Sequence, residues 1–411
     1  MTTAEDATLP FRLPKDWQAT FVGDEFFVIL GKMLDAEKNV GIPKPYLGNK
    51  SVQWGRIDTE DLSLIKLTPG DLRRYRLIEG DLLVCEGGDI GRSAIWRGQL
   101  GECYFQKALH RVRPRGGFSP VLLRYLLEYY SKTGFLLNFA TQTSIAHLPK
   151  DKFEVLPLPK PPAAEQQAIA EALSDADALI EGLERLIAKK RLIKQGAMQE
   201  LLTAKRRLPG FSGVWVETTL HKLLKAAPTY GINSAACQLG SGGYDYLRIT
   251  DIDEHGRLRP DGRAEVLHPT AANYFLEPND IVVARTGAST GKSHRYCGPS
   301  HRTVFAGFLI KLASAPDLVD PSYLFQFMQT EAYWSWIAEN SARSGQPGIN
   351  VQQLSGLRLT IPATIEEQQA IAEVLKDMDT EIQALETHLD KVRQVKEGMM
   401  HNLLTGQIRL V

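Results

Sequence analysis

The segment TGASTGKS, residues 286–293, has the residue types of a phosphate-binding loop, in which backbone amides and a lysine hold the phosphates of a nucleotide. That pattern requires glycine where this chain has Thr286, and a helix should follow, whereas the run from His294 to Pro299 does not favour a helix. The segment GGDIGRS (87–93) stands at the matching place in the first half of the chain. We therefore predict that both segments are hairpin turns rather than nucleotide sites.

Two further groups contain residue types that bind metals. The segment DIDEHG (251–256) begins like a calcium loop, but His255 replaces an oxygen ligand and Gly262 stands where a bidentate glutamate is needed. Three possible zinc donors lack a fourth at regular spacing: His294, Cys297 and His301. No motif of a serine nucleophile, a zinc protease or a dinucleotide site occurs in the sequence. We predict neither a metal site nor a catalytic site.

Basic residues gather in the predicted turns and loops of both halves. Arginine supplies charge to phosphates and a bidentate fork to guanine edges, so such loops can both position and read DNA. The candidate DNA-binding residues, with polar residues of two later loops, are Arg92, Lys107, Arg111, Arg113, Arg115, Thr143, Ser144, Arg248, Arg285, Thr286, Lys292, Arg343 and Gln346. For each residue the alternative is a solvated surface position balanced by nearby acidic side chains.

The composition is that of a globular protein. The 411 residues include 48 Lys+Arg and 48 Asp+Glu, with 43% apolar and 23% charged residues. Zero net charge excludes a general basic footprint, so any site for a polyanion must be a local patch. No apolar run reaches the roughly 18 residues of a membrane span, and the first residues do not resemble a secretory signal. We expect a cytoplasmic protein without a membrane partner.

An internal repeat is the strongest signal in the sequence. Residues 165–208 align without a gap on residues 367–410, and 23 of the 44 pairs are identical. The run EQQAIAE occurs in both copies, at 165–171 and 367–373. The chain is therefore a tandem duplication in which this segment has stayed similar.

Each copy of the repeat is predicted to be a long helix that begins after prolines, at Pro162 and Pro362. Apolar residues recur at alternating steps of four and three, which is typical of a coiled-coil seam. The predicted helix–helix interface comprises Ile169, Leu173, Ile180, Leu183, Ile187, Ile371, Leu375, Met378, Ile382, Leu385 and Leu389. Lys396 interrupts this stripe in the second copy, and Lys190 and Lys194 weaken it in the first.

Two divergent segments, 11–160 and 209–362, have related patterns of strands, glycine-rich turns and one amphipathic helix, Pro120–Tyr130 or Pro321–Trp336. Long alternation of strands and helices is missing, which favours α+β lobes over doubly wound sheets. We predict an α+β protein with two similar α/β lobes, joined by two long antiparallel coiled-coil helices with pseudo-two-fold symmetry within the chain. The expected domains are a first lobe (1–160), a central helix and linker (161–208), a second lobe (209–362) and a C-terminal helix (363–411).

This arrangement resembles the specificity subunit of type I restriction-modification systems. The resemblance rests on EQQAIAE in both copies, on PLPKPP (157–162) and LTIPAT (359–364), on the helix ends LLTAKRRL (201–208) and LLTGQIRL (403–410), and on the turn GDLLVCEGGDIGRSA that begins at residue 80. It covers nearly the whole chain. In that family the helices are the conserved regions and the lobes are two target-recognition domains.

The resemblance implies a non-catalytic protein that binds a bipartite target in double-stranded DNA, one half-site per lobe. It also implies two methyltransferase subunits and two restriction/translocase subunits as partners. S-adenosylmethionine, ATP and Mg²⁺ would belong to these partners, and this chain would bind no cofactor. The helices would act as a rigid spacer between the half-sites. Two alternatives stay open, namely a coiled-coil adaptor that joins two proteins without nucleic acid, and an enzyme that the motifs do not reveal.

Overall fold

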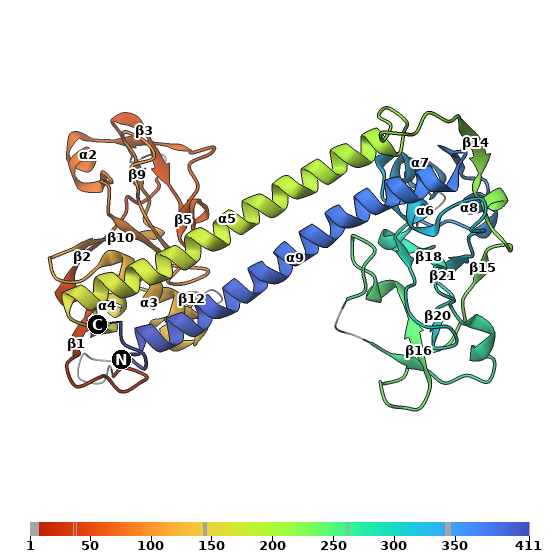
Figure 1. Ribbon diagram of the computed structural model, residues 1–411. Helices are drawn as coiled ribbons and strands as arrows, with labels where there is room; N and C mark the ends of the chain where they lie inside the picture. The colour runs from red at the N-terminus through yellow and green to blue at the C-terminus, as the bar shows by residue number, and fades with distance from the viewer. Residues whose placement is uncertain are drawn as a thin grey trace. The chain divides into compact units, whose positions relative to one another are not determined.

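The computed structural model describes residues 8–35, 37, 39–142, 146–259, 261, 263–341 and 347–410. The chain forms two compact units: unit 1 contains Met1–Glu184 and Thr387–Val411, and unit 2 contains Arg185–Glu386. Two long helices, α5 (Ala163–Leu201) and α9 (Ile365–Leu404), each contribute one stretch to each unit. Each unit therefore consists of one lobe and a pair of helical segments (Figure 1).

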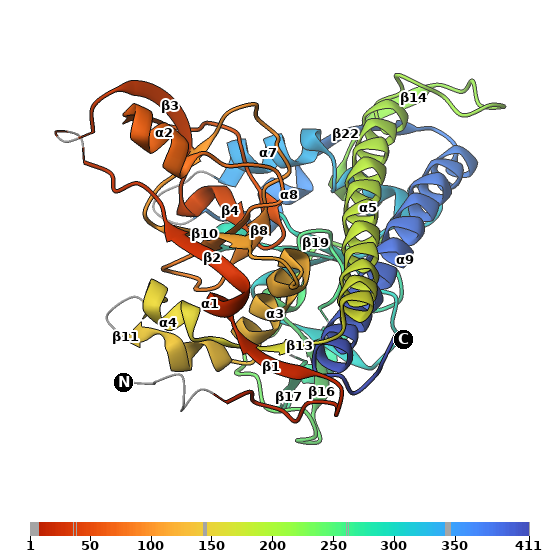
Figure 2. The ribbon, with the colours of Figure 1, turned by 90° about the vertical axis from the view of Figure 1, so that its left-hand side faces the viewer.

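In unit 1 the first part of α5 lies beside the last part of α9 (Figures 1 and 2). Asp177 forms an ion pair with Lys396 at 2.7 Å, and Glu184 forms one with Arg393 at 2.6 Å. As the residue number rises along α5, that of the partner on α9 falls. The two segments are therefore antiparallel.

Unit 2 contains the same ion pairs with the roles of the two helices exchanged. Asp379 of α9 pairs with Lys194 of α5 at 2.6 Å, and Glu386 pairs with Arg191 at 2.6 Å. These four residues are the repeat equivalents of Asp177, Lys396, Glu184 and Arg393. Each long helix therefore carries both halves of one complementary charge set.

The predicted seam residues differ in burial. Most are buried, namely Ile169, Leu173, Leu183, Ile187, Ile371, Leu375, Ile382 and Leu389. Ile180, Met378 and Leu385 are partly buried. Lys396 is buried in the seam because Asp177 and Glu128 surround its ammonium group. The interruption in the apolar stripe is thus an ion pair inside the helix pair.

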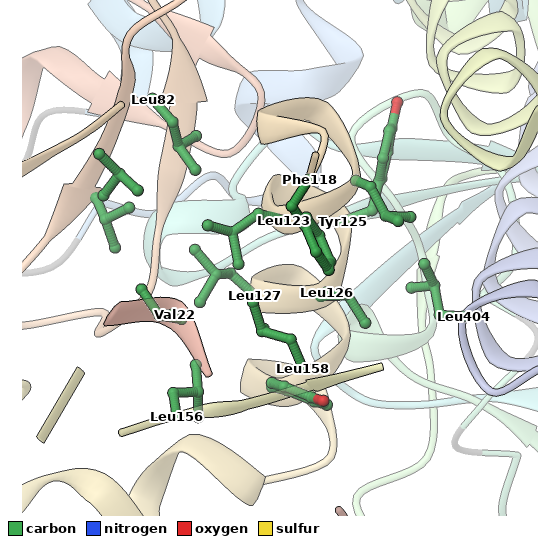
Figure 3. Close-up of a cluster of buried hydrophobic side chains, with 14 of the residues drawn as sticks. Val22, Leu82, Phe118, Leu123, Tyr125, Leu126, Leu127, Leu156, Leu158 and Leu404 are labelled. Atoms are coloured by element: carbon green, nitrogen blue, oxygen red, sulfur yellow. The ribbon is translucent and has the colours of Figure 1, made fainter. Parts of the chain in front are cut away.

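The lobe of unit 1 is built on an antiparallel four-stranded sheet in the order β2-β10-β7-β8. The strands are β2 (Phe26–Leu30), β10 (Leu109–Pro114), β7 (Leu82–Cys85) and β8 (Ser93–Ile95). Helix α3 (Pro120–Lys132) is capped by Ser119 and starts with proline, which suits the first helical position. Figure 3 shows Leu123, Leu126 and Leu127 of α3 among buried side chains that include Leu404 of α9. The lobe and the helix pair of unit 1 therefore share one core.

A two-stranded ladder closes the lobe of unit 1 at its junction with α5. Strand β1 (Gln18–Phe21) pairs with β13 (Pro157–Lys160), which leads into α5. A smaller sheet has the order β6-β3-β9, with β6 (Leu64–Leu67), β3 (Ile42–Leu47) and β9 (Tyr104–Phe105). The other short α-helices and strands are α1 (Val22–Glu25), β4 (Val52–Gln53), β5 (Arg56–Ile57), α2 (Pro69–Tyr75), β11 (Thr141–Gln142), β12 (Ala146–His147) and α4 (Lys150–Glu154).

The lobe of unit 2 repeats this plan with its own strands. The four-stranded sheet has the order β15-β21-β18-β19, with β15 (Thr229–Tyr230), β21 (Leu309–Leu312), β18 (Ile281–Ala284) and β19 (Ser293–Arg295). The closing ladder joins β14 (Trp215–Thr219) to β22 (Arg358–Pro362). The smaller sheet contains β17 (Glu265–Val266), β16 (Tyr244–Leu247) and β20 (Thr303–Phe305).

The predicted α+β class, with two similar lobes and long paired helices, is confirmed. The predicted helix Pro321–Trp336 is wrong in one respect, because the structure has two helices there, α6 (Pro321–Phe327) and α7 (Glu331–Ser341). A short helix, α8 (Val351–Ser355), follows them. The segment TGASTGKS forms the turn between antiparallel strands β18 and β19, as expected of a hairpin.

A buried carboxylate ties each lobe to both long helices. Glu165, at the start of α5, accepts a hydrogen bond from Trp17 Nε1 at 2.9 Å and one from Arg409 at 2.7 Å. Arg409 follows the end of α9. Burial opposes ionisation of Glu165, but the bonds from Arg409 and Trp17 outweigh it, so that the pKa of Glu165 lies below its usual value.

The equivalent carboxylate in unit 2 is Glu367, at the start of α9. It accepts hydrogen bonds from Arg207, at 2.6 Å for one pair of atoms, and from Trp215 Nε1 at 3.4 Å. The next residue also recurs, since Gln166 and Gln368 each accept from the backbone of the helix cap in their own lobe, at 2.9 and 2.8 Å. The EQQ run thus marks the junction between a lobe and its helix.

We predict that Glu165→Gln lowers the free energy of unfolding by about 2 kcal/mol at pH 7, because a charge-assisted pair with Arg409 is lost. Chemical denaturation checks this. A carboxyl whose pKa is lowered in the folded state stabilises above its unfolded pKa, near 4.5, and loses that contribution as the pH falls through the folded value. The difference between variant and wild type should therefore shrink at acid pH.

Glu171→Gln is the matched control, since Glu171 is exposed on the same helix and accepts a bond from Gln167. Equal loss of stability in the two variants would contradict the anchoring role of Glu165.

Candidate nucleic-acid interface

The two lobes have the same backbone frame at the point where their central strands end. Glu86 follows β7 and donates its backbone N–H to the carbonyl of Ala108 at 3.0 Å. Arg285 follows β18 and donates in the same way to Phe308, also at 3.0 Å. Leu148 and Ile349 donate to the carbonyls of Glu86 and Arg285, at 2.6 and 2.9 Å. Both residues are therefore fixed on both sides of the backbone, in equivalent places.

Two arginines of the candidate set, both on β10 of the first lobe, have internal partners. Arg113 forms two hydrogen bonds to the buried carboxylate of Asp81, at 2.7 and 2.8 Å. Arg111 donates to the carbonyls of Arg74 and Arg76, each at 3.0 Å. Burial and the neighbouring Arg113 lower the pKa of Arg111, although it stays protonated. These bonds hold strand β10 to its neighbours, which is a structural task.

Arg92 and Arg115 also bind the frame of the first lobe. Arg92 donates to the carbonyl and side-chain oxygens of Asn49, at 3.0 and 2.9 Å. Arg115 donates to the carbonyl of Gly23 at 3.2 Å and lies 4.0 Å over the ring of Phe27. Lys107, by contrast, is exposed in the turn before β10.

In the second lobe the candidates divide in the same way. Arg248 binds Asp251, with bonds at 2.8 and 3.2 Å, and Lys292 pairs with Glu254. Arg285 is stacked 4.4 Å over the ring of Tyr230. Thr286 is extended backbone and bridges to Gly348. Arg285 is therefore the candidate arginine of this lobe whose charge is not neutralised by a carboxylate among the described residues.

Four candidates lie outside the described residues, namely Thr143, Ser144, Arg343 and Gln346. For all thirteen candidates, contact with DNA stays a prediction.

The structure draws attention to residues that the sequence analysis did not select. Glu86 is half-buried beside Lys107 and His147, and burial raises its pKa while these two neighbours oppose the rise. The ring of Tyr230 lies under the guanidinium of Arg285. The side chain of Phe308, whose carbonyl accepts the backbone hydrogen bond from Arg285, is 59% exposed. The signal for this position was available, because the segments GDLLVCEGG and NDIVVARTG align so that Glu86 and Arg285 each follow the strand.

Among the residues that the structure describes, no three His, Cys, Asp or Glu side chains lie close enough to hold a metal ion. His294 Nδ1 donates a hydrogen bond to the carbonyl of Gly256 at 2.8 Å, and the burial of this side chain lowers its pKa. Within the same described ranges, no helix combines the length and apolar character that a membrane span requires.

Comparison with known proteins supports the repeat. A model of the type I restriction modification DNA specificity domain matches the chain twice, at residues 14–189 and 215–394. Two specificity subunits of Methanocaldococcus jannaschii, the putative MjaX subunit and the MjaVIII subunit, are 24% and 25% identical over 97% of this chain and 95% and 94% of their own lengths. The StySPI specificity subunit of Salmonella potsdam is 23% identical over 97% of this chain and 90% of its own length.

Solved structures show the same fold. The specificity subunit from M. genitalium superposes with a TM-score of 0.63, at 15% identity, over 98% of this chain and 99% of that chain. A chain from a type I restriction-modification assembly has a TM-score of 0.57, at 15% identity, over 97% of this chain and 100% of that chain. Because the domain model covers most of the chain in two copies, this protein belongs to the family of type I restriction-modification specificity subunits.

Proposed function

We propose that this chain reads a bipartite sequence in double-stranded DNA, with one half-site for each lobe. The observation that carries the proposal is that equivalent positions of the two lobes have the same backbone hydrogen bonds but different side chains. The hydrogen bonds that fix Glu86 and Arg285 are the same in the two lobes, whereas the side chains are of opposite charge. A shared frame with different side chains is what two different half-sites require.

We further propose that the chain has no catalytic activity of its own. The methyltransferase subunits would supply S-adenosylmethionine, the restriction/translocase subunits would supply ATP and Mg²⁺, and two copies of each would bind to this chain in the cytoplasm. The chain's own residues would select the DNA and hold the partners. A coiled-coil adaptor would bind two proteins but would show no preference among DNA sequences.

The helices offer a surface for a partner. On the stretch of α5 in unit 2, Leu186 is 38% exposed and Ile193, seven residues later, is 47% exposed; Leu192 is exposed beside them. Val395 on the stretch of α9 in unit 1 is the repeat equivalent of Ile193 and is also exposed. An apolar residue every seven positions is typical of a helix that packs on another helix. One exposed apolar residue per unit at this repeat position, Ile193 or Val395, fits two copies of one partner.

The first prediction concerns the half-sites. Exchange of residues 22–156 for the corresponding segment of a relative with a known target should change only one half of the methylated sequence. The exchange leaves the β1–β13 ladder and the contacts of Trp17 in place. Sequencing of DNA methylated by the complex with methyltransferase subunits measures the outcome. A change in both halves would show that the lobes do not read independently.

The second prediction concerns partner binding. Ile193→Glu should weaken retention of the methyltransferase subunit in affinity co-purification by roughly tenfold or more, because a charge would replace the apolar side chain that the bound subunit is proposed to cover. Ala188→Glu adds the same charge to an exposed position of α5 and serves as the control. Equal retention by both variants would exclude Ile193 from the contact surface.

A further inference from the structure

Glu86 and Arg285 occupy equivalent positions, and their surroundings confirm the equivalence. In the first lobe Gly87 bridges to His147, and in the second lobe Thr286 bridges to Gly348. A Cβ at Gly87 would lie 2.9 Å from Nδ1 of the His147 ring, so a larger residue there requires that ring to move. In the second lobe the larger residue lies on the other side of the bridge. Each bridge therefore joins one glycine to one larger residue, but the glycine is on opposite strands of the bridge in the two lobes, while the backbone pairing is the same.

The carboxylate of Glu86 and the guanidinium of Arg285 do not help to hold the lobes together. Among the described residues, no group donates a hydrogen bond to the carboxylate of Glu86, and no group accepts one from the guanidinium of Arg285. Arg285 Nε is buried without a partner, and the guanidinium face rests on Tyr230. Stacking fixes the plane of a guanidinium and leaves its edge free to donate. Arg113, in contrast, is saturated by Asp81.

The chemistry of the two groups differs in a way that selects bases. A carboxylate only accepts hydrogen bonds, and in the major groove it accepts from the amino group of cytosine. A guanidinium only donates, and its fork matches the O6 and N7 atoms of guanine. Phosphates would repel a carboxylate, so an acidic group on a DNA-binding surface needs a donor to bind. The positive charge of Lys107 beside Glu86 offsets that repulsion.

Resting on the proposed function, we infer that Glu86 and Arg285 are one base-reading position used twice: Glu86 selects cytosine in one half-site and Arg285 selects guanine in the other. The position lies at the end of the central strand in each lobe. Exposed Phe308 adds an apolar surface in the second lobe, where the first lobe has Ala108.

The test uses the full chain in complex with its methyltransferase subunits and reads the methylated motif by sequencing. Arg285→Lys keeps the positive charge but loses the fork, so the preference for guanine at one position of one half-site should fall roughly 5- to 100-fold. Glu86→Gln should move one position of the other half-site from cytosine towards adenine, because glutamine pairs with adenine. In each variant, the half-site that is read by the unaltered lobe should stay unchanged.

Two conservative controls involve groups that already have partners. Arg302→Lys affects a guanidinium bound to Asp245 at 2.9 Å, and Glu154→Gln affects a carboxylate paired with Lys150 at 3.4 Å. Both controls should leave the motif unchanged.

If Arg285→Lys and Glu86→Gln left the methylated motif unchanged, or weakened binding equally on all DNA sequences, this inference would be overturned. A bipartite motif in the wild-type complex would still support the proposed function in that case. A wild-type complex without any sequence preference would overturn both. The salt dependence of binding separates the two kinds of contact, since a lost base contact leaves the slope unchanged and a lost phosphate contact lowers it.

Discussion

A buried carboxylate at the start of each long helix is the constraint on which each unit depends. Glu165 receives hydrogen bonds from Trp17 of the lobe and from Arg409 beyond the end of the other helix, so three remote segments of the chain meet at one charge. Separation of any of them would leave a buried charge without its partner, which costs several kcal/mol. Glu367 repeats this arrangement in unit 2. The frame is therefore held by the repeat itself, and the lobes are free to diverge elsewhere.

Much of the fold could be predicted because short-range sequence patterns determine where its helices and strands begin and end. Prolines and the 3-4 apolar spacing predicted both long helices, and these run from Ala163 to Leu201 and from Ile365 to Leu404. Periodicity shows which face of a helix is buried but not what the opposite helix offers. Lys396 therefore read as a weakness of the seam, although Asp177, more than two hundred residues away in the sequence, is its partner.

The candidate site was harder to predict for the same physical reason. Residue type identifies arginines that can bind DNA, but only the fold shows that Asp81 already occupies Arg113 while the edge of Arg285 is free. Glu86 was passed over because a search for basic residues ignores acids. Comparison of the two lobes identifies this position, because the backbone hydrogen bonds are the same in both lobes while the side chain changes its charge. Residues of this kind are candidates for reading a target, whereas residues such as Arg113 hold the structure.

Hydroxyl-radical footprinting of the complex with methyltransferase subunits, on DNA that carries its methylated target, tests the central claim most directly. Two independent reading lobes predict two protected segments, and an exchange of one lobe should abolish protection of one segment while the other keeps its protection. A single protected segment, or protection that is lost from both segments together, would contradict the account.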